Sequence, residues 1–167
     1  RLPNSLFFIP YSYMFSFFSK KKSTPFPFHR LETDMHSHLL PGIDDGSPDV
    51  ETSIRLIKGL EELGYKKFIT TPHVMEDLYQ NNPRSIRTAH DNLKKGLVQN
   101  KLNTDITFAA EYLLDGNVDT LLEKKEPLLT IKDKMVLVEI SFASQPMHLK
   151  EILFELQMNG YQPIFAH

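Results

Sequence analysis

The chain has 167 residues, enough for one ordinary domain with a buried core. Its formal net charge of -2 and its isoelectric point near 6.4 provide no basic field that would attract nucleic acid or an anionic membrane surface. The absence of cysteine excludes disulfides, zinc–thiolate sites and thiol nucleophiles, and it agrees with a reducing cytoplasm. Any metal must therefore be held by nitrogen and oxygen atoms.

Residues 1–30 differ in composition from the rest of the chain, because they are rich in phenylalanine and contain the lysine run Lys20–Lys22. Their apolar pieces are shorter than the about 20 residues of a membrane span, and the lysines follow them, unlike the charges of a secretory signal. We interpret the segment as a disordered leader, with a peripheral membrane anchor as the alternative. Since the chain begins with Arg1, we expect translation to start at Met14 and residues 1–13 to be a gene-model artefact.

From Leu31 onward, strand-like and helix-like segments alternate. The first helix is expected over residues 48–63, with Ser47 as its N-cap, Pro48 in the first helical position and Gly64 at its C-terminal cap. Its apolar residues recur at helical spacing, at Val50, Ile54, Ile57 and Leu60.

The later elements are predicted in the same way. Strands are expected at 67–71, 105–111, 135–140 and 162–166, and helices at 82–99, 118–123 and 146–158. With a strand before His36, this gives five strands joined by four helical crossovers, which predicts an α/β fold with a parallel sheet. The last strand would be an uncovered apolar edge, so we expect the chain to be the N-terminal portion of a larger barrel.

Six side chains that can bind a metal lie at or beside the carboxyl ends of these predicted strands. They are His36, His38, His73, Glu111, Glu139 and His167. The carboxyl ends of parallel strands meet on one face, so these residues are expected to share a pocket. Imidazoles and carboxylates together bind divalent metals. The sequence therefore predicts a metal-dependent hydrolase, or a large piece of one.

His36 and His38 are two residues apart in an extended segment, so their side chains point the same way. A pair of surface histidines is the alternative, and the preceding Asp34 favours a metal. Asp34 could instead orient a histidine through its other ring nitrogen. Asp44 and Asp45 follow in a Pro/Gly loop, where ordinary turn formation and a carboxylate folding back onto metals are equally plausible.

The other candidate ligands are weaker signals when taken singly. Pro72 should keep Thr71 extended, so that His73 projects into the pocket, although a lone histidine is more often an exposed loop residue. Glu111 and Glu139 end apolar runs, where a carboxylate must face solvent, cap a group or face a cation. The other three histidines are interpreted as solvated, namely His29, His90 and His148.

Residues 34–46, Asp-Met-His-Ser-His-Leu-Leu-Pro-Gly-Ile-Asp-Asp-Gly, resemble a motif of the PHP (polymerase and histidinol phosphatase) superfamily. They are most similar to its manganese-dependent protein-tyrosine phosphatases from bacterial capsule and exopolysaccharide operons. The resemblance runs from about Leu31 to the last residue. Further matching segments follow in the expected order at Thr70–His73, Ala110–Tyr112, Leu137–Ser141 and Gly160–His167.

This resemblance implies a distorted (β/α)7 TIM-like barrel, of which the chain would supply about the first five β/α units as residues 31–167. It also implies up to three divalent ions, Mn²⁺ with iron or zinc as alternatives. Asp45 rather than Asp44 matches the family's ligand, and Glu111 or Glu139 would bridge two ions. The residues that match metal ligands are His36, His38, Asp45, His73, Glu111, Glu139 and His167. Four of these are expected to be essential for catalysis, namely His36, His38, Glu111 and His167.

The family continues beyond its match to His167 with an arginine-containing segment and an Asp-x-His pair, so we expect roughly a third of a ~250-residue barrel to be missing here. The implied activity is dephosphorylation of the tail of a membrane tyrosine kinase that controls polysaccharide synthesis or export. The implied location is cytoplasmic, with peripheral membrane association as an alternative and no nucleic-acid partner. Another PHP phosphoesterase, such as a histidinol-phosphate phosphatase, and an inactive fragment are the alternative functions.

Overall fold

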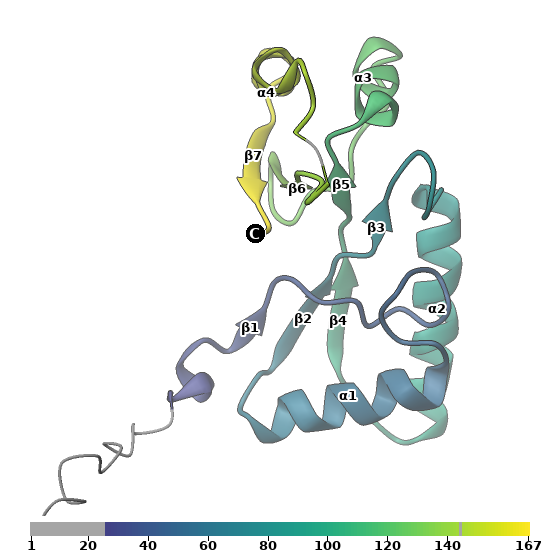
Figure 1. Cartoon of the computed structure of the whole chain (residues 1–167). Coiled ribbons are helices and arrows are strands. Elements are labelled where there is room, and N and C mark those ends of the chain that lie inside the picture. The colour runs from purple at the N-terminus through teal and green to yellow at the C-terminus, as the bar shows by residue number, and fades with distance from the viewer. Residues whose placement is uncertain (1–25, 144) are drawn as a thin grey trace, which may run out of the picture.

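The computed structural model describes residues 26–143 and 145–167, which form an α/β fold with two parallel sheets (Figure 1). One sheet has the order β1-β2-β4, with bounds Thr33–Asp34, Lys67–Thr70 and Asp105–Phe108. The other has the order β3-β5-β6-β7, with bounds His73–Val74, Glu111–Leu113, Met135–Glu139 and Gln162–Phe165. Most of the predicted leader lies outside the described residues, and within its described part residues 28–30 form a short 3-10 helix.

The predicted parallel pairing of strands is confirmed, but the strands form two sheets rather than one. The second and third predicted strands each break near their end, and the chain continues as β3 and β5 in the other sheet. The break in the second lies at Thr71 and Pro72, because proline has no N–H to donate to a neighbouring strand. The break in the third lies at residues 109–110. Backbone hydrogen bonds from Ala109 to Thr70 (2.9 Å) and from Glu111 to Pro72 (3.0 Å) continue across these breaks. The chain therefore passes directly from one sheet into the other at β2–β3 and β4–β5.

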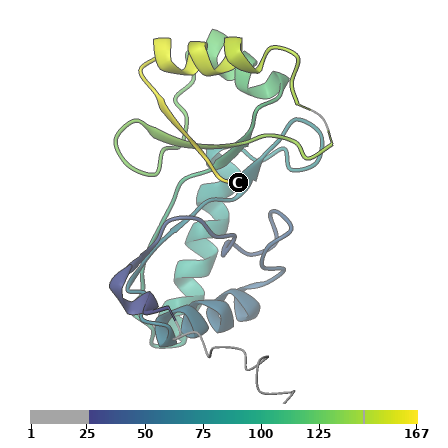
Figure 2. The same ribbon diagram turned by 60° about the vertical axis from the view of Figure 1, so that its left-hand side comes forward.

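Each sheet has its own pair of helices. The bounds are Val50–Glu62 for α1, Pro83–Gln99 for α2, Gly116–Glu123 for α3 and Leu149–Met158 for α4. Helix α1 packs against α2, and α2 against β4, whereas α3 packs against α4, and α4 against β7 (Figures 1 and 2). No helix in the described ranges is long and apolar enough to span a bilayer.

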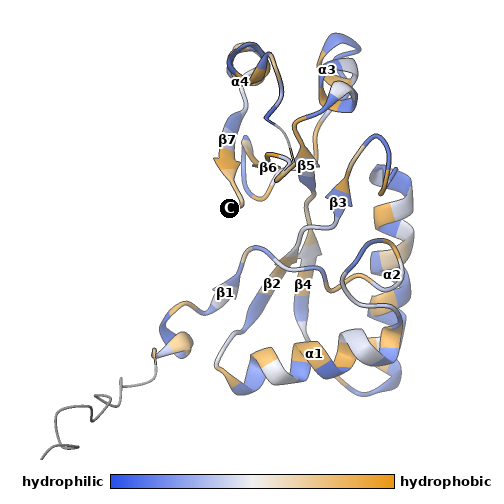
Figure 3. Ribbon diagram, viewed as in Figure 1, coloured by the Kyte–Doolittle hydropathy of each residue, from blue (hydrophilic) through white to orange (hydrophobic). Residues whose placement is uncertain are grey.

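Apolar side chains on these helices and on the strands fill the core. Figure 3 shows hydrophobic and hydrophilic positions alternating along α1 and α2, as expected for helices with one buried face. Ile57 of α1, Leu93 of α2, Val138 of β6 and Leu156 of α4 are fully buried. Burial of each such side chain contributes about 1.5–3 kcal/mol, so the core fixes the strand ends that carry the polar residues described below.

The start of α1 differs from the prediction. Its N-cap is Asp49, whose Oδ1 accepts a hydrogen bond from the N–H of Thr52 at 2.7 Å. Ser47 is instead fully buried, and its N–H donates to the carbonyl of His38 at 3.1 Å. Gly64 follows the helix with φ +105°, a conformation that favours glycine, as predicted.

The other helix ends agree more closely with the sequence. Helix α2 has the predicted bounds, and Asn82 caps it through a capping box with Ser85. Helix α3 begins two residues before the predicted Val118. Helix α4 begins at Leu149 rather than Pro146, and its N-cap residue, His148, makes no side-chain capping bond.

Candidate metal centre

The structure brings all seven predicted ligands together where the chain passes from the first sheet to the second. They come from the segment after β1, the following loop, the first residues of β3 and β5, the last residue of β6 and the segment after β7. These residues are His36, His38, Asp45, His73, Glu111, Glu139 and His167. The expected convergence at strand ends is therefore observed, while their role as metal ligands stays a prediction.

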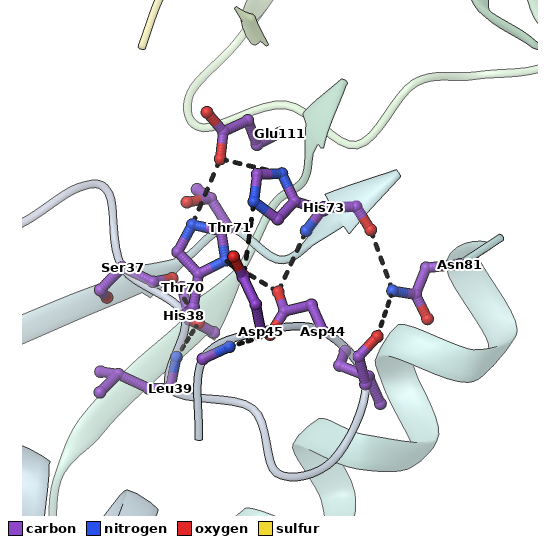
Figure 4. Close-up of polar contacts among 12 residues, drawn as sticks. Ser37, His38, Leu39, Asp44, Asp45, Thr70, Thr71, His73, Asn81 and Glu111 are labelled. Atoms are coloured by element: carbon purple, nitrogen blue, oxygen red, sulfur yellow. Dashed lines mark hydrogen bonds and ion pairs between the residues drawn. The ribbon is translucent and has the colours of Figure 1, made fainter. Parts of the chain in front are cut away.

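Glu111 lies at the centre of the cluster and is fully buried. Its Oε1 is 3.8 Å from His36 Nε2 and 3.6 Å from His167 Nε2. Its Oε2 is 3.2 Å from His38 Nε2 and 3.4 Å from His73 Nδ1 (Figure 4). Neither oxygen makes a hydrogen bond of normal geometry. Burial alone would raise the pKa of Glu111, but the surrounding imidazoles outweigh it and hold this pKa below its usual range.

The register of the second sheet explains why Glu111 meets His73. The two residues are direct partners in the parallel pairing of β3 with β5. Glu139 is paired with Leu113, so it lies two residues further along the sheet on the same face as Glu111. Its Oε1 reaches His73 Nδ1 at 3.3 Å.

Asp44 positions two of the histidines, although it was not among the predicted metal ligands. Its Oδ2 lies 2.8 Å from His38 Nδ1 and accepts the backbone N–H of His73 at 3.2 Å, while its Oδ1 accepts the N–H of Gly46 at 3.0 Å. Burial lowers the pKa of His38, but the hydrogen bond to Asp44 and the nearby negative charge of Glu111 outweigh it and raise that pKa to about 10. Sequence reasoning left open which of the two aspartates folds back, because their adjacency alone does not tell which carboxylate faces inward.

The loop that carries Asp44 is held tightly against the first strand. A Cβ at Gly46 would lie 2.3 Å from both the Cβ and the carbonyl oxygen of His38, so only glycine fits there. The side-chain amide of Asn81 donates to the carbonyls of Ile43 (2.8 Å) and His73 (2.9 Å), which joins the loop to β3 (Figure 4). Asn81 was not predicted to contribute to the site.

Asp45 approaches the same histidines from the solvent side. Its side chain is 63% exposed, and its Oδ1 lies 3.5 Å from His73 Nε2 and 4.0 Å from His38 Nδ1. The two adjacent aspartates therefore differ in their bonding partners. Asp44 is bound to protein groups, whereas Asp45 has a free carboxylate facing two imidazoles.

His36 is oriented by a hydroxyl group that sequence reasoning missed. Its Nδ1 lies 2.8 Å from Thr71 Oγ1. Asp34 does not contact a histidine ring nitrogen, contrary to the alternative role expected for it. Asp34 Oδ1 lies 3.5 Å from the backbone nitrogen of His36, and Oδ2 is buried without a partner. Burial lowers the pKa of His36, an effect that the nearby Glu111 carboxylate only partly offsets.

Two of the histidines stack against aromatic rings. The His73 ring lies on Tyr79 with centroids 5.6 Å apart and planes 11° from parallel. The His167 ring lies on Phe142 at 5.5 Å and 10°. The sequence motifs did not predict that either aromatic residue belongs to the site. Burial and the neighbouring Glu111 carboxylate raise the pKa of Glu139, which lines the same cavity as both stacked pairs.

Three groups of side chains have donor atoms that all lie within 4.8 Å of one another, a spacing that suits a shared cation. They are His36–Glu111–His167, His38–Asp45–His73 and His73–Glu111–Glu139. A buried carboxylate without hydrogen-bond donors is costly, and a cation is the partner that would remove this cost. The donors are all imidazole nitrogens and carboxylate oxygens, which suit a divalent transition metal.

Comparison with known proteins identifies the family. Residues 32–167 match the family model described as capsular polysaccharide synthesis, CpsB/CapC. The chain belongs to the CpsB/CapC family. It is 33% identical over 135 residues to the tyrosine-protein phosphatase YwqE of Bacillus subtilis (strain 168), covering 80% of this chain and 53% of that protein. It is 25% identical over 134 residues to the putative tyrosine-protein phosphatase CapC of Staphylococcus aureus, covering 80% and 52%.

A solved structure agrees with this CpsB/CapC assignment. The chain matches a crystal structure from work on YwqE of Bacillus subtilis and CpsB of Streptococcus pneumoniae, described as unique metal-dependent tyrosine phosphatases. The match has a TM-score of 0.71 and 32% sequence identity, and it covers 81% of this chain and 55% of the solved one. The chain thus spans about half the length of the CpsB/CapC relatives that it matches.

The remaining histidines of this CpsB/CapC chain lie away from the cluster. His29 and His148 are exposed, as predicted. The prediction that His90 is solvated is wrong, because its side chain is only 12% exposed. Its ring packs on Phe108 at 5.0 Å, and its Nε2 lies 3.1 Å from the carbonyl of Ile106. The helical face of α2 that turns toward β4 therefore includes His90.

Proposed function

We propose that the chain carries the metal centre of a metal-dependent protein-tyrosine phosphatase that acts in capsule or exopolysaccharide synthesis. The observation that carries this proposal is the buried Glu111 carboxylate, with two unpartnered oxygens facing four imidazoles. The names of its relatives, tyrosine-protein phosphatases, and the family's description, capsular polysaccharide synthesis, support the choice of reaction and process.

We assign metal binding to all seven clustered side chains and expect up to three Mn²⁺ ions. When bound, such ions would supply positive charge to the phosphoryl oxygens and lower the pKa of water. The seven are His36, His38, Asp45, His73, Glu111, Glu139 and His167. Of these, we expect four to be essential for catalysis, namely Glu111 and three of the histidines around its oxygens, His36, His38 and His167.

The chain's own hydrogen bonds prepare these side chains for metal binding. Asp44 accepts from Nδ1 of His38, which leaves Nε2, 3.2 Å from Glu111, as the nitrogen that would lose its proton when a metal binds. Thr71 engages Nδ1 of His36 and leaves its Nε2 facing the same carboxylate. Both rings therefore present Nε2 to the centre of the cluster, as a metal ligand must.

We further propose that the two sheets form part of a distorted (β/α)7 barrel, with residues 31–167 as the N-terminal portion of the phosphatase domain and residues 1–30 as a leader. The likeness to the solved tyrosine phosphatase, of which this chain covers 55%, supports this view. The proposed substrate is the phosphotyrosine-containing tail of a membrane tyrosine kinase. That partner implies a cytoplasmic location close to the membrane.

The test uses the full-length protein and a phosphotyrosyl peptide, with a phosphoseryl peptide and histidinol phosphate as comparison substrates. We expect Mn²⁺-dependent hydrolysis of the phosphotyrosyl peptide, its loss after exhaustive chelation, and its recovery when Mn²⁺ is returned. Metal content measured by mass spectrometry should fall in Glu111→Gln. Full activity after chelation would refute the metal mechanism, and preferred hydrolysis of histidinol phosphate would refute the protein substrate.

A further inference from the structure

A single cavity of about 470 Å³ joins the metal-donor cluster to an apolar wall. One side of the cavity is lined by four of the proposed metal ligands, Asp45, His73, Glu139 and His167. The rest of its lining is mainly apolar and aromatic, including Leu78, Tyr79 and Phe142. Once these side chains hold metal ions, a ligand that fills this space would carry an anionic group at one end and an apolar group at the other.

Two aromatic rings sit on the ligand histidines where these two parts of the lining meet. Tyr79 stacks on His73 and Phe142 stacks on His167, each within 11° of parallel. The ring centroids are 5.6 Å and 5.5 Å from those of the histidines. An anion held at the metal-loaded cluster would therefore place its first substituent, rather than a distant part of the ligand, beside these rings.

The apolar wall is strongly exposed. The side chain of Phe142 is 91% exposed and that of Leu78 is 77% exposed, although both lie at the rim of a cavity lined by charged groups. Single exposed apolar residues are common, but two beside a stacked tyrosine form a patch of the kind that marks binding sites. The segments that carry them, 75–80 and 141–143, follow His73 and Glu139 in sequence, respectively, and both line this cavity.

We propose that Leu78, Tyr79 and Phe142 form an aryl-binding rim that makes the site selective for aromatic over alkyl phosphate esters. This inference rests on the proposed phosphatase function and names the residues that determine its substrate class. The ester's ring packs against Phe142 and Tyr79 in offset or edge-to-face geometry, with Leu78 covering its edge. A phosphoserine side chain is too short and too polar to reach the same surface while its phosphate occupies the donor cluster.

The experiment measures binding without turnover. Phenylphosphonate and methylphosphonate carry the same anionic group and differ only in the substituent that would meet the rim. Calorimetric titration of the Mn²⁺-loaded full-length protein with each compound gives a ratio of dissociation constants. Because both compounds use the same anion site, any effect of a variant on metal loading cancels in this ratio.

We expect phenylphosphonate to bind the wild-type protein more tightly, and Phe142→Ala to reduce the ratio by about 3- to 10-fold, the contribution of one aromatic pair. Leu78→Ala should reduce it less, and Phe142→Tyr should restore it. The matched control is Met147→Ala, because Met147 is 98% exposed on the same segment but lines a neighbouring cavity. It should leave the ratio unchanged.

The outcomes separate this inference from the phosphatase function. An equal ratio in wild type, Phe142→Ala and Met147→Ala would overturn the rim, even if the enzyme hydrolyses phosphotyrosyl peptides. A ratio that falls in Phe142→Ala but not in Met147→Ala would support the rim, even if no turnover is found and the phosphatase function fails. Absence of binding by both phosphonates would overturn the rim together with the anion site.

Discussion

The two sides of Glu111 are organised differently. On the clamped side, which comprises His38, His73 and Asp44, one buried carboxylate ties both histidines together, and His73 is only 8% exposed. On the open side, His36 has one hydroxyl partner, and the side chain of His167 is 47% exposed. The protein's own hydrogen bonds therefore position one half of the cluster, whereas the position of the other half depends more on what binds between its side chains.

The largest effect is expected from Glu111→Gln, because Glu111 belongs to both sides. Glutamine keeps the shape but removes the charge, so we expect turnover of a phosphotyrosyl peptide to fall on the order of 10³-fold in the full-length protein. Thermal unfolding gives a second measurement. Excess Mn²⁺ at about 100 times its Kd should stabilise the wild type by about 2.7 kcal/mol, and this gain should be lost in the variant. An unchanged metal-induced shift would show that Glu111 is not a ligand.

The two neighbouring aspartates give the sharpest contrast. Asp44→Ala removes the acceptor shared by His38, His73 and Gly46, and we expect it to destabilise the metal-free protein by about 2–3 kcal/mol. Asp45→Ala removes an exposed carboxylate, so metal-free stability should stay unchanged while Mn²⁺ affinity falls. Chemical denaturation after chelation and calorimetric titration with Mn²⁺ measure the two quantities. Equal destabilisation by both variants would show that Asp44 and Asp45 do not differ in their contribution to the metal-free fold.

A steric change would displace the clamped side without removing a polar group. Gly46→Ala places a methyl group 2.3 Å from the His38 carbonyl oxygen, so the Asp44 loop must move. We expect turnover to drop about 10- to 100-fold, the usual effect of disturbing groups that orient a metal ligand. Gly59→Ala is the matched control, because nothing lies within 4 Å of its added methyl group. That helical substitution should instead stabilise the protein by about 1 kcal/mol.

The smallest effect on activity is expected outside both sides. His90→Ala removes a ring packed on Phe108, and we expect a loss of about 1–2 kcal/mol of stability with turnover unchanged. Denaturation and peptide hydrolysis, measured on the same preparation, check both parts. A loss of turnover larger than the loss of folded protein would mean that the site extends to α2.

The sequence predicted the parallel sheet, all four helices and the convergence of seven side chains, because these follow from hydrophobic periodicity and from the direction of parallel strands. It did not predict β3 or the break between β4 and β5, since the residues from Phe108 to Ala110 stay apolar through that break. It also missed Asp44, Thr71 and Tyr79. Their roles depend on distances across the fold, such as the 2.8 Å from Asp44 to His38, which no local pattern encodes.

The register of β5 has a consequence for how this family can vary. His73 faces Glu111 as a direct strand partner, and successive residues of a strand point to opposite faces. Insertion or deletion of one residue at 109–110 would turn Glu111 away from the histidines and present Tyr112 or Ala110 in its place. Length changes at that junction should therefore be absent from active relatives. The exposed turn at 124–126 contributes no side chain to the cluster, so it can lengthen or shorten without moving the cluster.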